Sequence, residues 1–226
     1  MSELDAALED FIAHEGLPAS YRDTVRQWFL PLAEQVLRQV AQRRRTLIVG
    51  VSGCQGSGKS TLAGVLVLLL KHLLGLRCIA LSLDDFYLTH AQRQSLGATV
   101  HPLLATRGVP GTHDVELALR TLRALREGGE VRIPRFDKAL DDRVPSAQWL
   151  CVLAPLDVVV LEGWCLGIGP EEAAALQTPL NALEAQEDAQ GVWRRYVNAQ
   201  LQGPYAVLYA LVEFLVLLQA PDFAQV

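Results

Sequence analysis

The residues best suited to chemistry in this sequence begin with a glycine-rich segment, Gly50 to Thr61, that follows a short apolar run. Within it, the spacing Gly53-x-x-x-x-Gly58-Lys59-Ser60 matches the phosphate-binding P-loop. Glycines let successive backbone N–H groups approach phosphate oxygens, and a helix that begins near Lys59 adds the positive end of its dipole. Lys59 supplies a cation and Ser60 a hydroxyl ligand for Mg²⁺. The segment predicts a site for nucleotide phosphates, with a plain glycine-rich turn between a strand and a helix as the alternative. The residues predicted to hold the nucleotide are Gly53, Cys54, Gln55, Gly56, Ser57, Gly58, Lys59, Ser60 and Thr61.

Carboxylates follow two further apolar runs. Residues 77–83 have the composition of a buried parallel strand and end at Asp84 and Asp85, while the β-branched run 157–161 ends at Glu162. In open α/β sheets, ligands bind at the carboxyl ends of the strands. Phosphoryl transfer needs a metal near the β- and γ-phosphates, a carboxylate at the acceptor hydroxyl, and cations on the moving charge. The three strand ends together therefore indicate phosphoryl transfer and not nucleotide binding alone.

Length and charge limit the class of protein. A chain of 226 residues and 24.8 kDa suffices for one α/β domain with a substantial core. With 20 basic and 25 acidic residues the formal net charge is -5, so no nucleic-acid partner is predicted. We expect no signal peptide and no membrane contact, because the apolar runs are too short or are interrupted by charges. The four cysteines lack C-x-x-C spacing, so we expect reduced thiols in a cytoplasmic protein.

The positions of these motifs predict an α/β fold, the three-layer sandwich of P-loop NTPases, with a mostly parallel central sheet flanked by helices. We expect residues 1–45 to form an N-terminal helical preface packed on the core, and residues 46–226 to form the P-loop domain. The strands are predicted at 46–51, 77–83, 131–133, 157–161 and 213–218. The helices are predicted at 60–74, 114–127 and 193–201, with a further helical stretch after Gly169-Pro170, a loop at 179–188, and a loop region with short helical pieces at 89–110.

Five segments of the sequence resemble one family. They are the P-loop, Ser82–Thr89, Arg107–Asp114, Pro134–Lys138 and Leu161–Gly167. Together they are similar to the glycerate 3-kinase group of P-loop kinases, which is related to uridine kinase, phosphoribulokinase and pantothenate kinase. The resemblance runs from about residue 46 to the C-terminus.

The resemblance implies ATP and Mg²⁺ as cofactors and gives roles to single residues. Asp84 stands where the related kinases have the carboxylate that accepts the proton of the acceptor hydroxyl. Glu162 matches their metal-side acid, while Lys59 and Ser60 keep their P-loop roles. The predicted catalytic residues are therefore Lys59, Asp84 and Glu162, and the predicted metal ligands are Ser60 and Glu162. For Asp85, two roles are open: a contact with a metal-bound water or substrate, or a cap for the following turn.

A glycerate-type acceptor is a small anion, so its carboxylate needs basic partners besides those on ATP. The candidate cations are Arg107, Arg135, Lys138 and Arg143. The alternative for each is a loop side chain that is simply exposed to solvent. Arg143 matches a substrate-contacting arginine of uridine kinases, and His113 and Asp114 resemble the family's substrate-side pair, with a role in fixing the turn as the alternative. The predicted substrate-binding residues are Asp85, Tyr87, Arg107, His113, Asp114, Arg135, Asp137, Lys138 and Arg143.

Members of this group continue past the strand at 213–218 with an arginine-bearing helix that resembles a mobile lid over ATP. We expect this lid to be absent from residues 46–226. The leading interpretation is an ATP-dependent kinase that transfers the γ-phosphoryl group of ATP to a hydroxyl of D-glycerate. The alternatives are a kinase for a nucleoside or pantothenate, and an ATP-binding switch protein with impaired catalysis.

Overall fold

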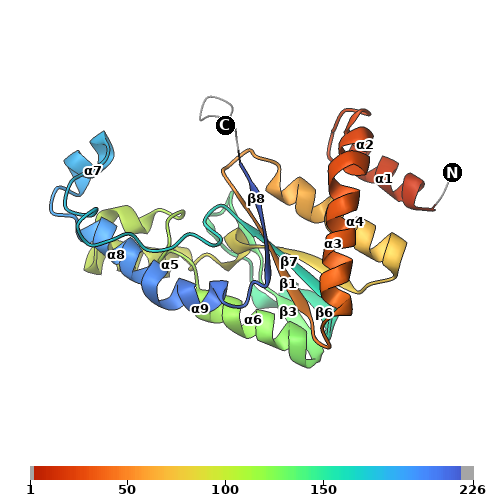
Figure 1. The fold of residues 1–226 in the computed structure, drawn as a ribbon. Coiled ribbons are helices and arrows are strands. Elements are labelled where there is room, and N and C mark those ends of the chain that lie inside the picture. Colours follow the sequence, from red (N-terminus) through yellow and green to blue (C-terminus); the bar gives the residue numbers. More distant parts are fainter. Residues whose placement is uncertain (1–2, 220–226) are drawn as a thin grey trace.

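The fold is built on a parallel four-stranded sheet. A computed structural model describes residues 3–219 of the chain. The sheet has the order β2–β7–β1–β8, with β1 pairing in parallel with both β7 and β8, and β2 pairing in parallel with β7 (Figure 1). The strands are β1 (Leu47–Gly53), β2 (Cys78–Ser82), β7 (Val158–Gly163) and β8 (Phe214–Leu218). Because β1, β2 and β7 are parallel neighbours, their carboxyl ends meet at one edge of the sheet.

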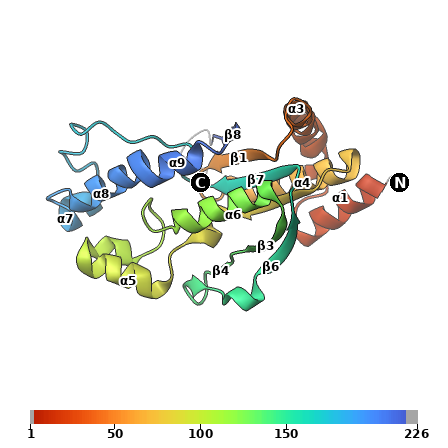
Figure 2. The same cartoon turned by 90° about the horizontal axis from the view of Figure 1, so that it is seen from below.

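Helices cover both faces of this sheet, which completes the expected three layers. Successive side chains of β1 point to opposite faces of the sheet. Val49 and Val51 belong to a core shared with α1 (Glu3–His14), α3 (Leu30–Ala41) and α4 (Lys59–Leu74). Ile48 belongs to the opposite core, which contains residues of α6 (Val115–Glu127), the π-helical turn Leu201–Tyr205 and α9 (Ala206–Tyr209). Figure 2 shows the sheet between these two helical layers from below. The predicted α/β sandwich is confirmed.

The N-terminal helices pack directly on α4. The chain leaves α1 through Gly16, whose φ of 64° is in the left-handed region, and continues through α2 (Tyr21–Thr24) and the π-helical turn Val25–Phe29 into α3. Val36 in α3 is fully buried and shares one apolar cluster with Leu62 and Leu66 of α4. Residues 3–41 therefore complete one face of the core.

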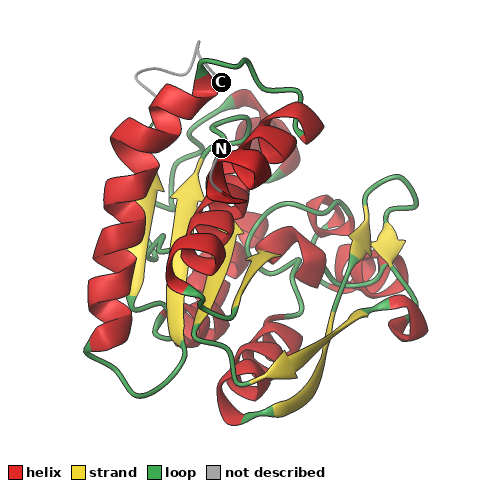
Figure 3. Cartoon of the chain, turned by 90° about the vertical axis from the view of Figure 1, so that its right-hand side faces the viewer, coloured by secondary structure: helices red, strands yellow, loops and turns green. Residues whose placement is uncertain are grey.

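Two small antiparallel sheets lie beside the main one (Figure 3). One pairs β3 (Gly129–Ile133) with β6 (Leu150–Ala154), and the other pairs β4 (Phe136–Asp137) with β5 (Asp142–Arg143). The strand β6 was not predicted, because its sequence lacks the alternation of apolar and polar residues that marks a half-buried strand. In the structure, Leu150 and Leu153 of this strand are exposed. Its conformation is decided by pairing with β3.

The region 89–110, predicted to be a loop with short helical pieces, contains a ten-residue helix. Thr89 and Gln92 form a capping box, in which each side chain bonds the other residue's backbone N–H, and α5 (His90–Thr99) follows. A 3₁₀ turn, Pro102–Ala105, comes next. The expectation of short helical pieces in a loop region is thus met in part.

The prediction of a helix after Gly169-Pro170 was wrong, because residues 170–181 form turns and irregular backbone. Residues 171–175 are exposed and have no apolar face to bury, and a short isolated helix is unstable in water. The helix lies inside the predicted loop instead, as α7 (Ala182–Glu187), where the Asn181 side chain accepts a hydrogen bond from the Glu184 N–H. The next helix, α8 (Val192–Gln200), matches its prediction.

Among residues 3–219, no helix combines the length and the apolar character needed to cross a membrane. Residues 220–226 lie outside the described part of the chain.

Candidate active site

The P-loop turns between β1 and α4 in the way its glycines require. Gly58 has a φ of 84° and caps α4, which begins at Lys59. Gly53 approaches the last strand so closely that a Cβ there would lie 2.8 Å from the Leu218 carbonyl oxygen. The Lys59 ammonium donates a hydrogen bond to the Cys54 carbonyl oxygen at 2.7 Å. The loop therefore gathers backbone N–H groups and one mobile cation at the start of a sixteen-residue helix.

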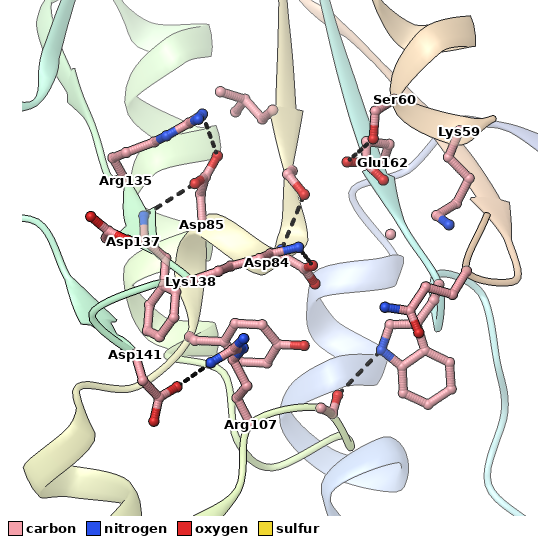
Figure 4. A pocket seen from close by; sticks show the side chains of 18 of the residues that line it. Lys59, Ser60, Asp84, Asp85, Arg107, Arg135, Asp137, Lys138, Asp141 and Glu162 are labelled. Atoms are coloured by element: carbon pink, nitrogen blue, oxygen red, sulfur yellow. Dashed lines mark hydrogen bonds and ion pairs between the residues drawn. The ribbon is translucent and has the colours of Figure 1, made fainter. Parts of the chain in front are cut away.

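Glu162 reaches the P-loop from the neighbouring strand. It is the next-to-last residue of β7, with 8% of its surface exposed, and its Oε1 accepts a hydrogen bond of 3.0 Å from the Ser60 hydroxyl (Figure 4). A carboxylate and a hydroxyl are the hard oxygen donors that Mg²⁺ prefers. Within residues 3–219 no cluster of three or more His, Cys, Asp or Glu side chains could hold a metal. Ser60 and Glu162 would fit Mg²⁺ in the manner usual for that ion, in which phosphate oxygens and waters supply the other ligands.

The two acids after β2 have different environments. Both lie in a 3₁₀ turn, Leu83–Phe86, in which the Ser82 hydroxyl accepts a hydrogen bond from the Asp84 N–H. Asp84 pairs with the Lys138 ammonium at 2.6 Å. Asp85 accepts a hydrogen bond from the Phe136 N–H at 3.1 Å, and burial raises its pKa. Asp85 therefore ties the β4–β5 hairpin to this turn, while Asp84 is held by a side-chain ion pair.

One cavity of about 1620 Å³ joins these groups. Typical ligand pockets measure about 300–1000 Å³, so this one has room for a nucleotide and a second small molecule. Figure 4 shows Lys59, Ser60 and Glu162 at one end and the β4–β5 hairpin at the other. Of the predicted residues, its lining includes Cys54, Gln55, Gly56, Lys59, Ser60, Asp84, Asp85, Tyr87, Arg107, Arg135, Asp137, Lys138 and Glu162.

Three predicted substrate residues, His113, Asp114 and Arg143, do not line this cavity. Asp114 caps α6 by accepting the Leu117 N–H at 2.9 Å, and Arg143 binds Asp114 at 3.1 Å and the Tyr87 carbonyl oxygen at 2.8 Å. Arg143 is thus committed to holding the loop before α6. For Asp114, the alternative role in fixing the turn describes the geometry better than substrate contact. The alternative for Arg143, a solvated loop arginine, does not fit, because its side chain is only 14% exposed.

His113 is buried behind the cavity wall with 5% of its surface exposed. Its Nδ1 lies 2.6 Å from the Tyr205 hydroxyl, and its ring stacks on Tyr87 with 4.2 Å between centroids. Burial lowers the pKa of His113 to about 3, so the imidazole is neutral at physiological pH. Tyr87 continues the stack to the cavity, and burial together with the nearby Asp84 charge raises its pKa. His113 therefore supports Tyr87 from behind and does not itself line the cavity.

The sequence missed several lining residues, among them Gln94, Thr106 and Asp141. Asp141 is the most consequential, because it pairs with Arg107 at the end of the cavity that holds the β4–β5 hairpin (Figure 4). No periodicity or motif spacing singles it out. Its neighbours, Arg93 and Arg107, are 48 and 34 residues away in sequence.

A P-loop after β1, with one acid on the neighbouring strand β7 and another after β2 on the far side of β7, is the arrangement of a P-loop kinase. Residues 48–168 match the model of the Phosphoribulokinase / Uridine kinase family, and the chain belongs to that family.

Individual relatives agree with this assignment. The chloroplastic D-glycerate 3-kinase of Arabidopsis thaliana is 37% identical over 171 residues, which cover 68% of this chain and 36% of that protein. An uncharacterized kinase of Schizosaccharomyces pombe is 34% identical over 195 residues, covering 82% of this chain and 69% of that one. The chain thus spans about a third of the chloroplast protein's length. Among solved structures, D-glycerate 3-kinase from Cryptococcus neoformans superposes with a TM-score of 0.71 at 30% identity, covering 88% of this chain and 75% of that chain.

Proposed function

We propose that this protein transfers the γ-phosphoryl group of ATP to a hydroxyl of D-glycerate. The observation that carries the proposal is a single cavity in which the P-loop and Asp84 are joined to three cations, Arg107, Arg135 and Lys138. Each of these cations has a carboxylate partner within the protein, and each could also bind the carboxylate of a hydroxy acid, which a neutral acceptor lacks. Two of the similar proteins carry the name D-glycerate 3-kinase, which supports the same acceptor.

At the nucleotide end, the P-loop N–H groups and Lys59 would bind the phosphates. The Lys59 ammonium would exchange its hydrogen bond with the Cys54 carbonyl oxygen for phosphate oxygens, a change that needs only side-chain rotation. Mg²⁺ held by Ser60 and Glu162 would offset the negative charge of the β- and γ-phosphates. Glu162 is fixed for this role by its place in the central strand β7.

At the acceptor end, Asp84 would accept a hydrogen bond from the substrate hydroxyl and take its proton late in the transfer. A carboxylate is a weak base near neutral pH, so alignment of the hydroxyl and stabilisation of charge supply most of the rate. Lys138, 2.6 Å from Asp84, places a positive charge next to the position of the transferred group.

The first test is ATP consumption by this chain with Mg²⁺ and one acceptor at a time: D-glycerate, uridine or pantothenate. We expect turnover with D-glycerate, and the phosphorylated hydroxyl would be identified by phosphorus NMR. Turnover with uridine or pantothenate alone would replace the acceptor in this proposal. Retained ATP binding without turnover on any acceptor would contradict it and favour the ATP-binding switch.

A further inference from the structure

A cluster at the acceptor end of the cavity is centred on Asp141. This residue lies in the turn between β4 and β5 and lines the cavity. Its carboxylate contacts three basic side chains: His90 at 3.1 Å, Arg93 at 2.8 Å and Arg107 in a short ion pair. The two arginines also lie over the Phe136 ring, at 5.4 and 5.8 Å from its centroid. The cluster is therefore built from three separate segments of the chain.

Arg93 forms the buried half of this cluster. It comes from α5 and has no exposed surface, although arginine is almost never fully buried unless it is paired. Its Nη2 donates to the Asp141 carbonyl oxygen at 2.7 Å, and its Nη1 to the carboxylate at 3.2 Å. Asp141 thus supplies both the counter-charge and the backbone acceptor that keep Arg93 inside the protein.

The charges of the cluster leave a surplus for an anion. Arg93 and Arg107 contribute two positive charges and Asp141 one negative charge, so the three together carry +1. An isolated pair of Asp141 and Arg107 would be neutral and would attract an anion weakly. Arg93, placed behind Asp141, restores the positive field at the point where Arg107 faces the cavity.

Arg107 also keeps donors for a ligand. A guanidinium has five N–H donors, and the acceptor that residues 3–219 offer Arg107 is the Asp141 Oδ1. In Figure 4 the Arg107 guanidinium is turned toward Asp141 on the side of the cavity that also holds Asp84. A short hydroxy acid could therefore direct its hydroxyl to Asp84 and its carboxylate to the remaining edge of Arg107.

We propose that Asp141, backed by Arg93, is a positioning residue that holds Arg107 as the recognition group for the carboxylate of the acceptor. The inference rests on the proposed function, because it assigns the acceptor end of the same site. It makes the Asp141–Arg107 pair the determinant that separates acidic acceptors from neutral ones. Arg93 acts through Asp141 and does not touch the substrate.

Asp141→Asn is a suitable variant, because it removes the charge and keeps the backbone preference. Asp141 has a φ of 52°, in the left-handed region, and asparagine tolerates this region as well as aspartate does. We expect the KM for D-glycerate to rise about tenfold, equivalent to about 1.4 kcal/mol. The KM for ATP and the kcat at saturating glycerate should stay within about twofold. Asp141→Glu should recover part of the lost affinity, since it restores the charge.

The matched control is Asp142→Asn, because Asp142 holds the same helix without touching either arginine. Its carboxylate accepts the His90 N–H at 3.1 Å, and it does not line the cavity. This variant should leave the KM for glycerate unchanged even if the melting temperature falls. A lowered melting temperature in Asp141→Asn with an unchanged KM for glycerate would show a structural role and overturn the inference. An equal rise in the KM for ATP would overturn it as well.

A binding measurement on the wild-type protein distinguishes failure of the proposed kinase function from failure of the anion-site inference. D-glycerate should raise the melting temperature of the wild-type protein more than glycerol does, and Asp141→Asn should lose this difference. If wild type turns over no acceptor but shows the difference, the kinase proposal fails and the anion site stands. If wild type responds alike to glycerate and glycerol, the anion site is refuted whatever the turnover.

Discussion

At the residue scale, the acids of the site differ in what holds them. Glu162 is anchored in a central strand and bonded to Ser60, and Asp85 is tied to the backbone of the β4–β5 hairpin. Among residues 3–219, the ionic partner of Asp84 is Lys138, whose long side chain is exposed. Of the three, Asp84 is therefore the carboxylate best placed to exchange its partner for a substrate hydroxyl.

This difference leads to a prediction for Asp84→Asn. The amide keeps the size of the side chain but cannot accept the proton, so turnover should fall by about 10²–10⁴-fold. ATP affinity, measured by calorimetry, should change by less than about twofold, because the P-loop is untouched. The control is Asp23→Asn, an exposed acid in α2. An unchanged rate of phosphoryl transfer would refute the assignment of Asp84 as the base.

Buried His113 predicts how stability depends on pH. Its pKa is lowered from 6.5 to about 3 by burial, so between these values the unfolded chain binds a proton that the folded chain does not. The contribution to stability is therefore fully present above pH 6.5 and is lost as the pH falls, by up to about 1.4 kcal/mol per pH unit. From pH 7 to pH 5 this residue should cost about 2 kcal/mol of unfolding free energy.

The measurement is urea denaturation at both pH values for wild type and His113→Gln. The variant is expected to be less stable throughout, but its difference between pH 7 and pH 5 should be smaller by about 2 kcal/mol. His14→Gln, at an exposed histidine in α1, should keep the wild-type difference. An identical pH dependence in wild type and His113→Gln would show that His113 takes up a proton while folded.

At the scale of elements, the end of β7 and the turn after β2 fix the acids relative to one another. A Cβ added at Gly163 would lie 2.9 Å from the Cβ of Leu83, a fully buried residue at the start of the turn that carries Asp84. The absence of a side chain at Gly163 therefore sets the spacing between Glu162 and Asp84.

Gly163→Ala should disturb this spacing. Overpacking a tight core contact costs about 1–3 kcal/mol, which would appear as a lower urea midpoint. Because the displaced turn carries Asp84, kcat should fall about tenfold or more even at temperatures where the variant is fully folded. Gly169→Ala is the matched control, since a Cβ there meets nothing within 4 Å. A loss of stability with normal kcat would mean that the turn moves without displacing Asp84.

The elements also explain what could be predicted from the sequence. The P-loop and the acids after two strands were predictable, because motif spacing and apolar runs are local signals, and parallel strands bring their ends together. The positions of Arg143 and Asp141 were not predictable, because their partners Asp114, Arg93 and Arg107 come from other segments. A loop arginine in a motif looks the same in sequence whether it faces substrate or a helix cap.

At the scale of the whole molecule, contacts far from the cavity join its parts. Glu213, just before β8, binds three arginines: Arg43 after α3, Arg45 before β1, and Arg126 in α6. These pairs connect the last strand with the first strand and with helices of both layers. Together with the apolar cluster shared by α3 and α4, they lead us to propose that residues 1–45 unfold together with 46–226 and not as a separate unit.

Val36→Ala tests this cooperativity, because Val36 is fully buried in α3 against the P-loop helix. Removing two methyl groups should cost about 2 kcal/mol and lower the single melting transition by about 4–8 °C. Trp28→Ala, at a residue 64% exposed, should change stability by less than about 0.5 kcal/mol. If the helices formed their own domain, calorimetry would resolve two transitions, and only the one belonging to residues 1–45 would move. A single shifted transition would instead mean that the helices before the P-loop stabilise α4, and with it the start of the nucleotide site.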